Sequence, residues 1–287
     1  MRPRYRVLAL DLDGTLLSRD KSVSRRNGEA VQAALGAGVR IVLATGRRYP
    51  AARPIAEQLG EDIPLVLHNG GLIVEGREVV RCSPLARDVA VLAIQLGREA
   101  GAEPVVHCGH EGEGKLLVER MPPTEPVLAM YLRRAHADVQ VVGDVLGALP
   151  EEDPIQVMFG GSIERMDPLL AALSSGVGGG EPPGTGGRAR LERTVYPEHG
   201  VEIIDVLAPG VGKAEAMRFV CSRFGLTPAD ALAIGDNWND AEMLLEAGRG
   251  LVMGNADEGL HRLGLEVLPS NDDDGVAVGI DRHLFAE

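Results

Sequence analysis

Several short apolar runs in this chain end abruptly at glycine or at a polar residue, and this pattern restricts the fold more than any other feature. The runs are residues 7–10, 39–44, 64–67 and 231–234. Runs of this length, bounded in this way, are typical of strands buried on both faces. Helical patterns separate the first three runs, and alternating strands and helices form a parallel sheet through right-handed crossovers. The sequence therefore predicts an α/β fold built on a parallel sheet.

The middle of the chain does not follow this pattern. After the third run come a hairpin pattern and then helices separated by short strands, the order of an α+β module. A strand pattern at residues 201–205 indicates a return to the parallel sheet. We therefore expect a Rossmann-like core domain, residues 1–82 and 191–287, with an α+β cap domain, residues 83–190, inserted into it. The glycine-rich residues 174–187 are expected to be a flexible surface loop.

Composition restricts the class of protein further. With 287 residues, the chain is long enough for two domains. Its net charge of −13 disfavours nucleic acid and anionic membranes as partners, because both require a basic patch. No apolar stretch approaches the length of a membrane span, and three scattered cysteines are typical of a reducing compartment. We expect a cytoplasmic protein, monomer or homodimer, whose partner is a small molecule.

Two aspartates, Asp11 and Asp13, directly follow the first apolar run. Residues i and i+2 of a strand point the same way, so both side chains are directed at one place. Their mutual repulsion favours a hard divalent cation with oxygen ligands, of which Mg²⁺ is the usual one. Gly14 lets the backbone turn and present amide groups to an anion. Taken alone, the motif is equally compatible with a calcium-type loop or a plain turn.

Polar residues also follow the second run and begin a later helix. Thr45 supplies a hydroxyl group and Gly46 permits close approach of the backbone, so this pair can hold phosphate oxygens. Lys213 supplies a cation that would neutralise charge on a phosphoryl group. Each feature also has a structural explanation, a turn for the first pair and an exposed position at a helix start for Lys213.

The last apolar run ends in a third polar group. Asp236 supplies a further carboxylate for a metal, and Asp240 follows about one helical turn later on the same face, unless it serves only as an N-cap. Asn239 offers an amide donor. The joint occurrence of these groups at strand ends, where open α/β sheets place their sites, indicates phosphoryl transfer.

The motifs DLDGTLL, LATGR, a GK at a helix start and GDNWND resemble the four motifs of the haloacid dehalogenase (HAD) superfamily of phosphatases. HNGG, MGNA and NDDDGV resemble turns of its Cof-type branch, subfamily IIB. This resemblance implies a HAD-like core with an inserted cap. It also implies a Mg²⁺-dependent phosphoric monoester hydrolase, which would act on small phosphorylated metabolites, with sugar phosphates the first choice.

The resemblance also implies roles for the candidate residues. Asp11 would attack phosphorus and form an aspartyl-phosphate, while Asp13 would protonate the leaving alcohol and then deprotonate the attacking water. The implied ligands of Mg²⁺ are the Asp11 carboxylate, the Asp13 main-chain carbonyl and Asp236, with Asp240 as a direct or indirect ligand. The phosphoryl oxygens would be held by Thr45, Gly46, Asn239 and Lys213.

Four further residues have weaker signals. Arg47 could reach the substrate, although an arginine at a helix start more often faces solvent. His107 and His110 lie in the expected cap and could contact the leaving group, although incidental surface positions are more common. Asn69 is expected to brace the loops of the site rather than to contact phosphate.

Three other functions deserve comparison. A phosphomutase would share the chemistry but need a cap that holds a sugar diphosphate, with several arginines, and few arginines cluster in this cap. A regulator that binds a phosphorylated metabolite without catalysis would be expected to lack Asp13 or Asp236, and both are present. A two-component receiver domain also uses Asp, Lys and Mg²⁺, but it is shorter and has no cap.

Overall fold

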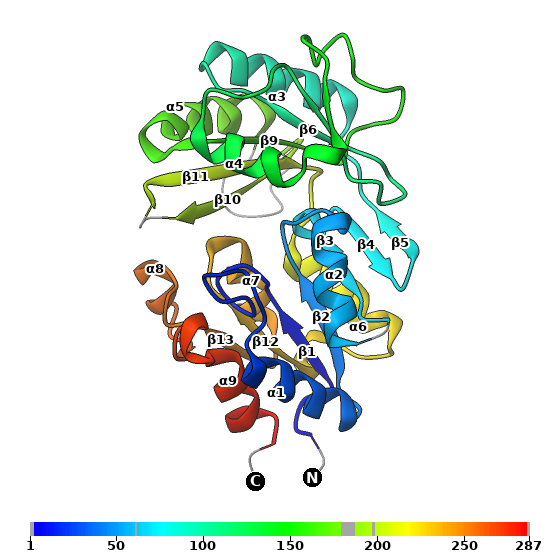
Figure 1. Ribbon diagram of the computed structural model, residues 1–287, viewed down its shortest axis with the longest axis vertical. Helices are drawn as coiled ribbons and strands as arrows, with labels where there is room; N and C mark the ends of the chain where they lie inside the picture. Colours follow the sequence, from blue (N-terminus) through cyan, green and yellow to red (C-terminus); the bar gives the residue numbers. More distant parts are fainter. Residues whose placement is uncertain (1–2, 61, 179–186, 197–198, 286–287) are drawn as a thin grey trace. The chain divides into compact units, whose positions relative to one another are not determined.

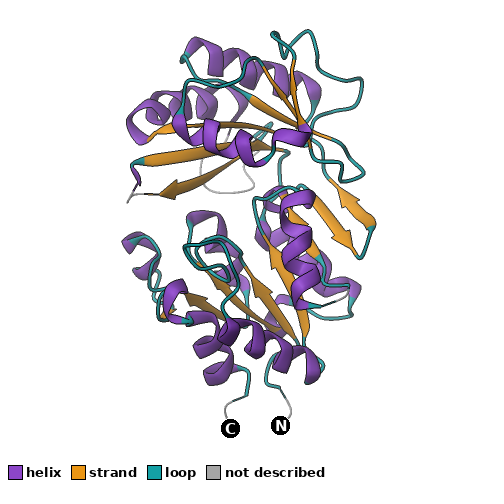
Figure 2. Ribbon diagram, in the orientation of Figure 1, coloured by secondary structure: helices purple, strands orange, loops and turns teal. Residues whose placement is uncertain are grey.

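The computed structural model describes residues 3–60, 62–178, 187–196 and 199–285, which form two compact units (Figure 1). Unit 1 comprises Met1–Arg47, Ala51–Val80 and Gly212–Glu287, and unit 2 comprises Arg48–Pro50 and Arg81–Val211. Each unit has its own sheet and its own hydrophobic core. The α/β class predicted from the sequence is confirmed, as Figure 2 shows by its alternation of helices and strands.

Unit 1 is organised around an eight-stranded sheet with the order β14-β13-β12-β1-β2-β3-β4-β5. Strand β1 is completely buried and pairs in parallel with β12 on one side and β2 on the other. Strand β4 turns back antiparallel to β3. The strands are β1 (Val7–Leu10), β2 (Arg40–Ala44), β3 (Leu65–Leu67), β4 (Leu72–Glu75), β5 (Glu78–Cys82), β12 (Ala231–Gly235), β13 (Arg249–Val252) and β14 (Glu266–Val267).

Helices pack on this sheet. Helix α1 begins where the side chain of its N-cap residue, Ser24, accepts a hydrogen bond from the backbone N–H of Asn27. The C-terminal helix α9 packs against α1, and α6 packs against β2 and β3. The helices are α1 (Arg25–Gly36), α2 (Tyr49–Leu59), α6 (Lys213–Arg223), α7 (Ala241–Glu246), α8 (Glu258–His261) and α9 (Gly275–His283).

Unit 2 contains a six-stranded sheet with the order β10-β11-β9-β6-β7-β8. Helices α3 (Arg87–Glu99) and α5 (Ile163–Leu173) cover one face of the sheet, and α4 (Pro126–Arg134) packs on the other. The strands are β6 (Val105–Cys108), β7 (Lys115–Val118), β8 (Val139–Val141), β9 (Gln156–Ser162), β10 (Arg190–Tyr196) and β11 (Val201–Leu207). This mixture of antiparallel strands and helices is the α+β organisation expected for the insertion.

The second boundary of the insertion differs from the prediction. Strand β11 was expected to return to the parallel sheet, but it pairs antiparallel with β9 and β10 in the sheet of unit 2. The predicted boundary between residues 190 and 191 is therefore wrong, and unit 2 continues to Val211. The reason is physical: a short buried run has the same composition in a parallel and in an antiparallel sheet, so the run alone does not identify its neighbours.

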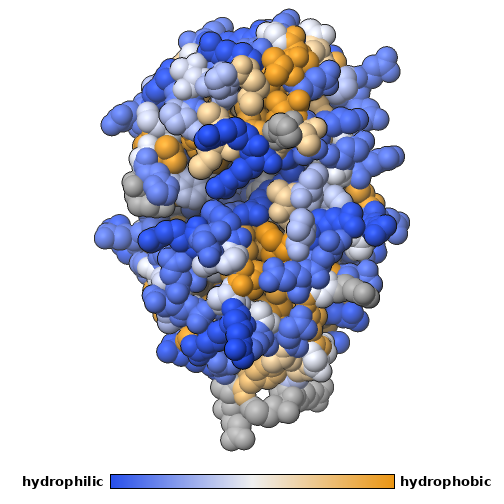
Figure 3. Space-filling view, in the orientation of Figure 1, coloured by the Kyte–Doolittle hydropathy of each residue, from blue (hydrophilic) through white to orange (hydrophobic). Residues whose placement is uncertain are grey.

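The surface and the helices of the described residues bear on whether the chain could cross a membrane. Figure 3 shows a face of the molecule covered mainly by hydrophilic side chains. Among the described residues, we find no helix with the length and apolar character that crossing a membrane requires. Ser174–Gly178 continue α5 as a further helical segment, whereas residues 179–186 of the predicted glycine-rich loop lie outside the described residues.

Candidate active site

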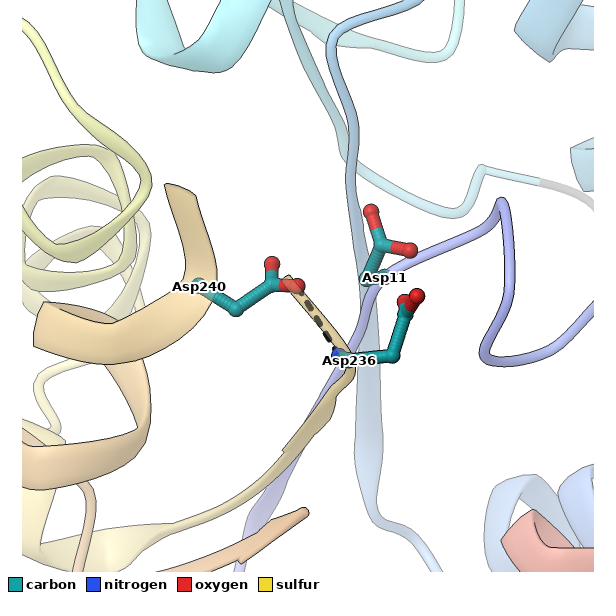
Figure 4. Close-up of side chains that lie close together, drawn as sticks. All are labelled: Asp11, Asp236 and Asp240. Carbon is teal, nitrogen blue, oxygen red and sulfur yellow. Dashed lines mark hydrogen bonds between the residues drawn. The ribbon is translucent and has the colours of Figure 1, made fainter. Parts of the chain in front are cut away.

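Three aspartates predicted as metal ligands lie together at one edge of the sheet of unit 1 (Figure 4). Asp11 directly follows β1, Asp236 directly follows β12, and Asp240 ends the short helical turn Trp238–Asp240. Because β1 and β12 are parallel neighbours, their carboxyl ends meet at the same edge. One carboxylate oxygen from each residue lies within 4.8 Å of the others, and all three side chains are buried.

The backbone after β12 fixes the position of Asp240. Its Oδ2 accepts hydrogen bonds from the backbone N–H groups of Asp236 and Asn237, both at 3.0 Å. The turn is a 3₁₀ helix rather than the start of α7, which begins at Ala241. Asp240 therefore closes the turn with one carboxylate oxygen and directs the other toward the site.

Lys213, the first residue of α6, lies between two of these aspartates, Asp11 and Asp240. Its Nζ donates hydrogen bonds to Asp11 Oδ1 at 2.7 Å and to Asp240 Oδ1 at 2.6 Å, and its side chain is almost completely buried. Burial by itself would lower the pKa of the ammonium group, but the two carboxylates outweigh burial and hold that pKa above its ordinary value. Lys213 is thus charged at neutral pH.

One lysine does not balance three buried carboxylates. Burial, helped by the negative charge of Asp240, raises the pKa of Asp11 to about 7 against the opposing effect of Lys213. Burial and the negative charges of Asp11 and Asp240 also raise the pKa of Asp236 well above its ordinary value. Oxygen ligands with an excess of negative charge are what a hard divalent cation such as Mg²⁺ requires. The residues therefore fit the metal expected from the sequence.

The carboxylate of Asp13 does not belong to this group of three and pairs with cations. Arg47 donates from Nε to Oδ2 at 2.6 Å and from Nη2 to Oδ1 at 2.7 Å, and Lys21 Nζ lies 2.9 Å from Oδ1. Burial would raise the pKa of Asp13, but the hydrogen bonds and charges of Arg47 and Lys21 hold it well below the usual range. Arg47 therefore does not simply face solvent, as the position at a helix start suggested.

The residues expected to hold phosphate lie around a short turn after β3. Thr45 is buried, and its carbonyl oxygen accepts a hydrogen bond from the backbone N–H of Asn69 at 3.0 Å. A Cβ atom on Gly46 would lie 3.2 Å from Asn69 Oδ1, so this glycine allows the two loops to approach. The same Asn69 oxygen accepts a hydrogen bond from Asn239 Nδ2 at 3.0 Å. Asn69 thus braces loops, in line with the expectation for it.

The loop after Asp13 closes on Asp236. Gly14 has a φ of +85°, a conformation that favours glycine, and a Cβ atom there would lie only 2.2 Å from Asp236 Oδ2. Thr15 Oγ1 donates a hydrogen bond to Asp236 Oδ1 at 2.7 Å. No role was predicted for Thr15 or Lys21 from the sequence. The signal that could have found Thr15 is its place directly after the glycine of the aspartate motif.

The two candidate histidines, His107 and His110, lie in unit 2. His107, in β6, is buried and stacks on Tyr131, with ring centroids 6.1 Å apart. It therefore does not occupy the incidental surface position that we considered more common. His110 follows β6, and its Nε2 lies 2.5 Å from the carbonyl oxygen of Asp153.

Three carboxylates and a buried lysine lie together at the carboxyl ends of parallel strands. This arrangement defines a class of α/β enzymes with an acidic site that suits a metal ion. Comparison with known proteins identifies the family within this class. The family described as haloacid dehalogenase-like hydrolase matches residues 8–280. The chain belongs to this family, and the family expected from the sequence is confirmed.

Individual relatives of this chain are phosphatases, in agreement with the family. An HMP-PP phosphatase from Serratia proteamaculans is 30% identical over 88% of this chain and 85% of its own length. A solved structure of a phosphatase of the HAD superfamily from Bacteroides thetaiotaomicron is 26% identical, with a TM-score of 0.77 over 97% of this chain and 95% of that one. The enzyme class expected from the sequence, a HAD-type phosphoric monoester hydrolase, is confirmed by these phosphatase relatives.

One relative is much longer than this chain. The chloroplastic endoribonuclease YBEY of Arabidopsis thaliana is 26% identical over 99% of this chain but only 47% of its own length. The chain thus spans about half of that relative.

Proposed function

We propose that this chain is a Mg²⁺-dependent phosphatase that hydrolyses small phosphorylated metabolites, sugar phosphates first, through an aspartyl-phosphate on Asp11. The observation that carries the proposal is the buried group formed by Asp11, Asp236 and Asp240, in which the ammonium of Lys213 pairs with Asp11 and Asp240. The phosphatases among the relatives support the reaction type.

Asp11 is the proposed nucleophile. Lys213 holds Oδ1 of its carboxylate, which leaves Oδ2 to attack phosphorus in line with the leaving group. A bond forms between Oδ2 and phosphorus while the ester bond to the leaving alcohol breaks. Water then attacks the phosphorus of the aspartyl-phosphate, releases inorganic phosphate and regenerates the carboxylate.

Asp13 is the proposed acid and base. It would give a proton to the leaving alcohol and later take one from the attacking water. In the present arrangement Arg47 and Lys21 favour its charged form, the form that accepts the proton from water. Donation of a proton in the first half of the reaction therefore requires that the ion pair between Asp13 and Arg47 weaken when substrate binds.

The proposed metal site consists of the Asp11 carboxylate, the Asp13 main-chain carbonyl, Asp236 and Asp240. When bound, Mg²⁺ would supply charge neutralisation for the phosphoryl oxygens. Those oxygens would be held by Thr45, Gly46, Asn239 and Lys213, and the hydrogen bond from Asn239 to Asn69 supports this arrangement by fixing the amide.

The proposal is tested by phosphate release from phosphorylated sugars, nucleotides and cofactors, with Mg²⁺ and with EDTA. We expect release that depends on the metal and that Asp11→Asn abolishes in a folded protein. Asp281→Asn is the matched control, because Asp281 is an exposed residue of α9 whose carboxylate only faces Arg26. If Asp11→Asn still turned over substrate, Asp11 would not be the nucleophile. An acid quench should trap phosphate on the wild-type protein.

The same assay separates the alternatives. Transfer of the phosphoryl group to another sugar hydroxyl instead of water would identify a phosphomutase, and binding without either reaction would identify a regulator. We further propose a cytoplasmic location, which the three free cysteines support, because an oxidising compartment favours disulfides.

A further inference from the structure

Two asparagines near the C-terminus hold the loop that follows Asp13. Asn255 Nδ2 donates a hydrogen bond to the carbonyl oxygen of Gly14 at 2.8 Å, and Asn271 Nδ2 donates one to the carbonyl oxygen of Leu17 at 2.8 Å. The asparagines are also joined to each other, because Asn255 Oδ1 accepts a hydrogen bond from the backbone N–H of Asn271 at 2.9 Å. We call Asn255 and Asn271 the asparagine clamp.

The sheet of unit 1 brings the clamp to the loop. Asn255 lies in the turn after β13, which starts beside the end of β12, since the backbone N–H of Met253 donates to the carbonyl oxygen of Gly235 at 3.0 Å. Asn271 begins a short 3₁₀ turn before α9. The segments are tied together by a hydrogen bond from the backbone N–H of Gly254 to the carbonyl oxygen of Pro269. Backbone hydrogen bonds thus tie the turn of Asn255 both to the end of β12 and to the segment that precedes Asn271.

The turn that contains Asn271 also holds the continuation of the loop. Asp272 Oδ1 accepts a hydrogen bond from the backbone N–H of Arg19 at 2.8 Å, and Asp274 Oδ1 accepts one from Ser24 Oγ at 2.5 Å. Between these two points lies Lys21, which pairs with Asp13. The whole segment from Gly14 to Ser24 is therefore fixed from the C-terminal part of the chain.

The position of this loop matters because it is in direct contact with the site. Gly14 lies against the Asp236 carboxylate with no room for a Cβ atom, and Thr15 donates to the same carboxylate. A displacement of the Gly14 carbonyl would therefore move the Asp236 carboxylate with it. A misplacement of about 1 Å in a catalytic group can reduce a rate roughly 100-fold.

We propose that Asn255 and Asn271 are positioning residues for phosphoryl transfer, which act through the Gly14–Leu17 backbone on Asp236 and Asp13. The inference rests on the proposed function. It predicts that loss of either asparagine lowers kcat roughly 10- to 100-fold and leaves KM little changed, because the substrate is bound by other loops.

A matched control separates positioning from simple stabilisation. Asn27, in α1, is completely buried and its Oδ1 accepts a hydrogen bond from the backbone N–H of Ala277 in α9 at 2.9 Å. Asn27→Ala therefore also removes an asparagine bond to the C-terminal segment, but not one to the loop. We expect Asn27→Ala to lower Tm while kcat and KM stay at the wild-type values.

The experiment compares Asn255→Ala, Asn255→Asp, Asn271→Ala and Asn27→Ala, each assayed well below its own Tm. Asn255→Asp keeps the acceptor for the backbone N–H of Asn271 and loses the donor to Gly14, so we expect it to behave like Asn255→Ala. Hydrogen exchange of the loop backbone, measured in EDTA, is the second readout. We expect faster exchange in the loop for the three clamp variants and wild-type exchange there for Asn27→Ala.

Two outcomes would overturn the inference. One is that the clamp variants have the same kcat as Asn27→Ala. The other is that hydrogen exchange in the loop of the clamp variants is as slow as in the wild-type protein. If the wild-type protein hydrolyses no phosphorylated compound, the proposed function fails, and the exchange measurement alone still decides whether the clamp holds the loop.

Discussion

Replacing Asp11 with asparagine should stabilise the metal-free protein at alkaline pH while it abolishes turnover. Asparagine has the shape of a protonated aspartic acid but never ionises. Burial raises the pKa of the Asp11 carboxyl from its ordinary value of 3.8 to about 7. Between those two pH values the folded protein keeps a proton on Asp11 that the unfolded chain has released. The wild-type protein therefore loses unfolding free energy as pH rises through this window, and the variant does not.

The size of the effect follows from the shift. The difference between the two pKa values is about 3 units, and each unit corresponds to about 1.4 kcal/mol, so the wild-type protein loses about 4 kcal/mol between about pH 4 and about pH 8. At about pH 4 both side chains are neutral, and the two proteins should have similar stability. At about pH 8 Asp11→Asn should be more stable by that amount. Asp236 changes the wild-type stability in the same direction, because its pKa is also raised.

Urea denaturation in EDTA at several pH values measures this difference. The single tryptophan, Trp238, lies two residues after Asp236 and reports on unit 1 by its fluorescence. Asp281→Asn should follow the wild-type curve at every pH. Added Mg²⁺ should raise the stability of the wild-type protein at alkaline pH and raise that of Asp11→Asn much less. Parallel pH dependences for wild type and Asp11→Asn would refute the reasoning, because they would show that Asp11 bears no burial penalty.

Three further substitutions test other contacts of the site. Lys213→Met should destabilise the metal-free protein by about 3–5 kcal/mol in denaturant titrations, because it leaves buried carboxylates without their cation. Gly14→Ala should abolish stabilisation by Mg²⁺ in thermal melts, since its Cβ would collide with the Asp236 carboxylate; an unchanged response would contradict the close contact. Arg47→Ala should raise the pKa of Asp13 and remove about 2 kcal/mol of stability at neutral pH. The lowered pKa of Asp13 contributes stability above the pKa that this carboxyl has in the unfolded chain, and the contribution is lost as pH falls. The stability difference between wild type and Arg47→Ala should therefore vanish in acid, and denaturant titrations at neutral and at acidic pH would measure this.

The parts of the fold that were predictable from sequence are those with a local physical signal. The run at β1 is short, apolar and ended by aspartate, so it identifies a buried strand without knowledge of its neighbours. Strand β11 is also rich in β-branched apolar residues, although it includes Glu202 and Asp205, and its pairing depends on strands that the run does not specify. Helix α9 was not predicted at all: it begins with one glycine and contains a second. Its stability comes from packing, because α9 contacts α1 and β12 and its Val276 and Ile280 are buried.

The residues of the candidate site also divide into those that the sequence predicted and those that it did not. Asp11, Lys213, Asp236 and Asp240 were recognisable because each follows a strand or begins a helix, and the sheet brings such positions to one edge. The ion pair between Asp13 and Arg47 was not, since the choice of a side-chain partner 34 residues away depends on loop geometry. The same is true of the asparagine clamp, whose contacts join residues separated by 241 and 254 positions.

The central place of β1 in its sheet has a consequence for the order of events during synthesis. Strand β1 is made first, and β2 soon follows on one side of it, but β12 on the other side is separated from it by more than half of the chain. Until the ribosome has made β12, the edge of an entirely apolar strand has no partner in this sheet, and such an edge promotes aggregation. We therefore expect nascent chains that stop before β12 to depend on chaperones, and the synthesis of β12 to be the step that gives β1 its second partner.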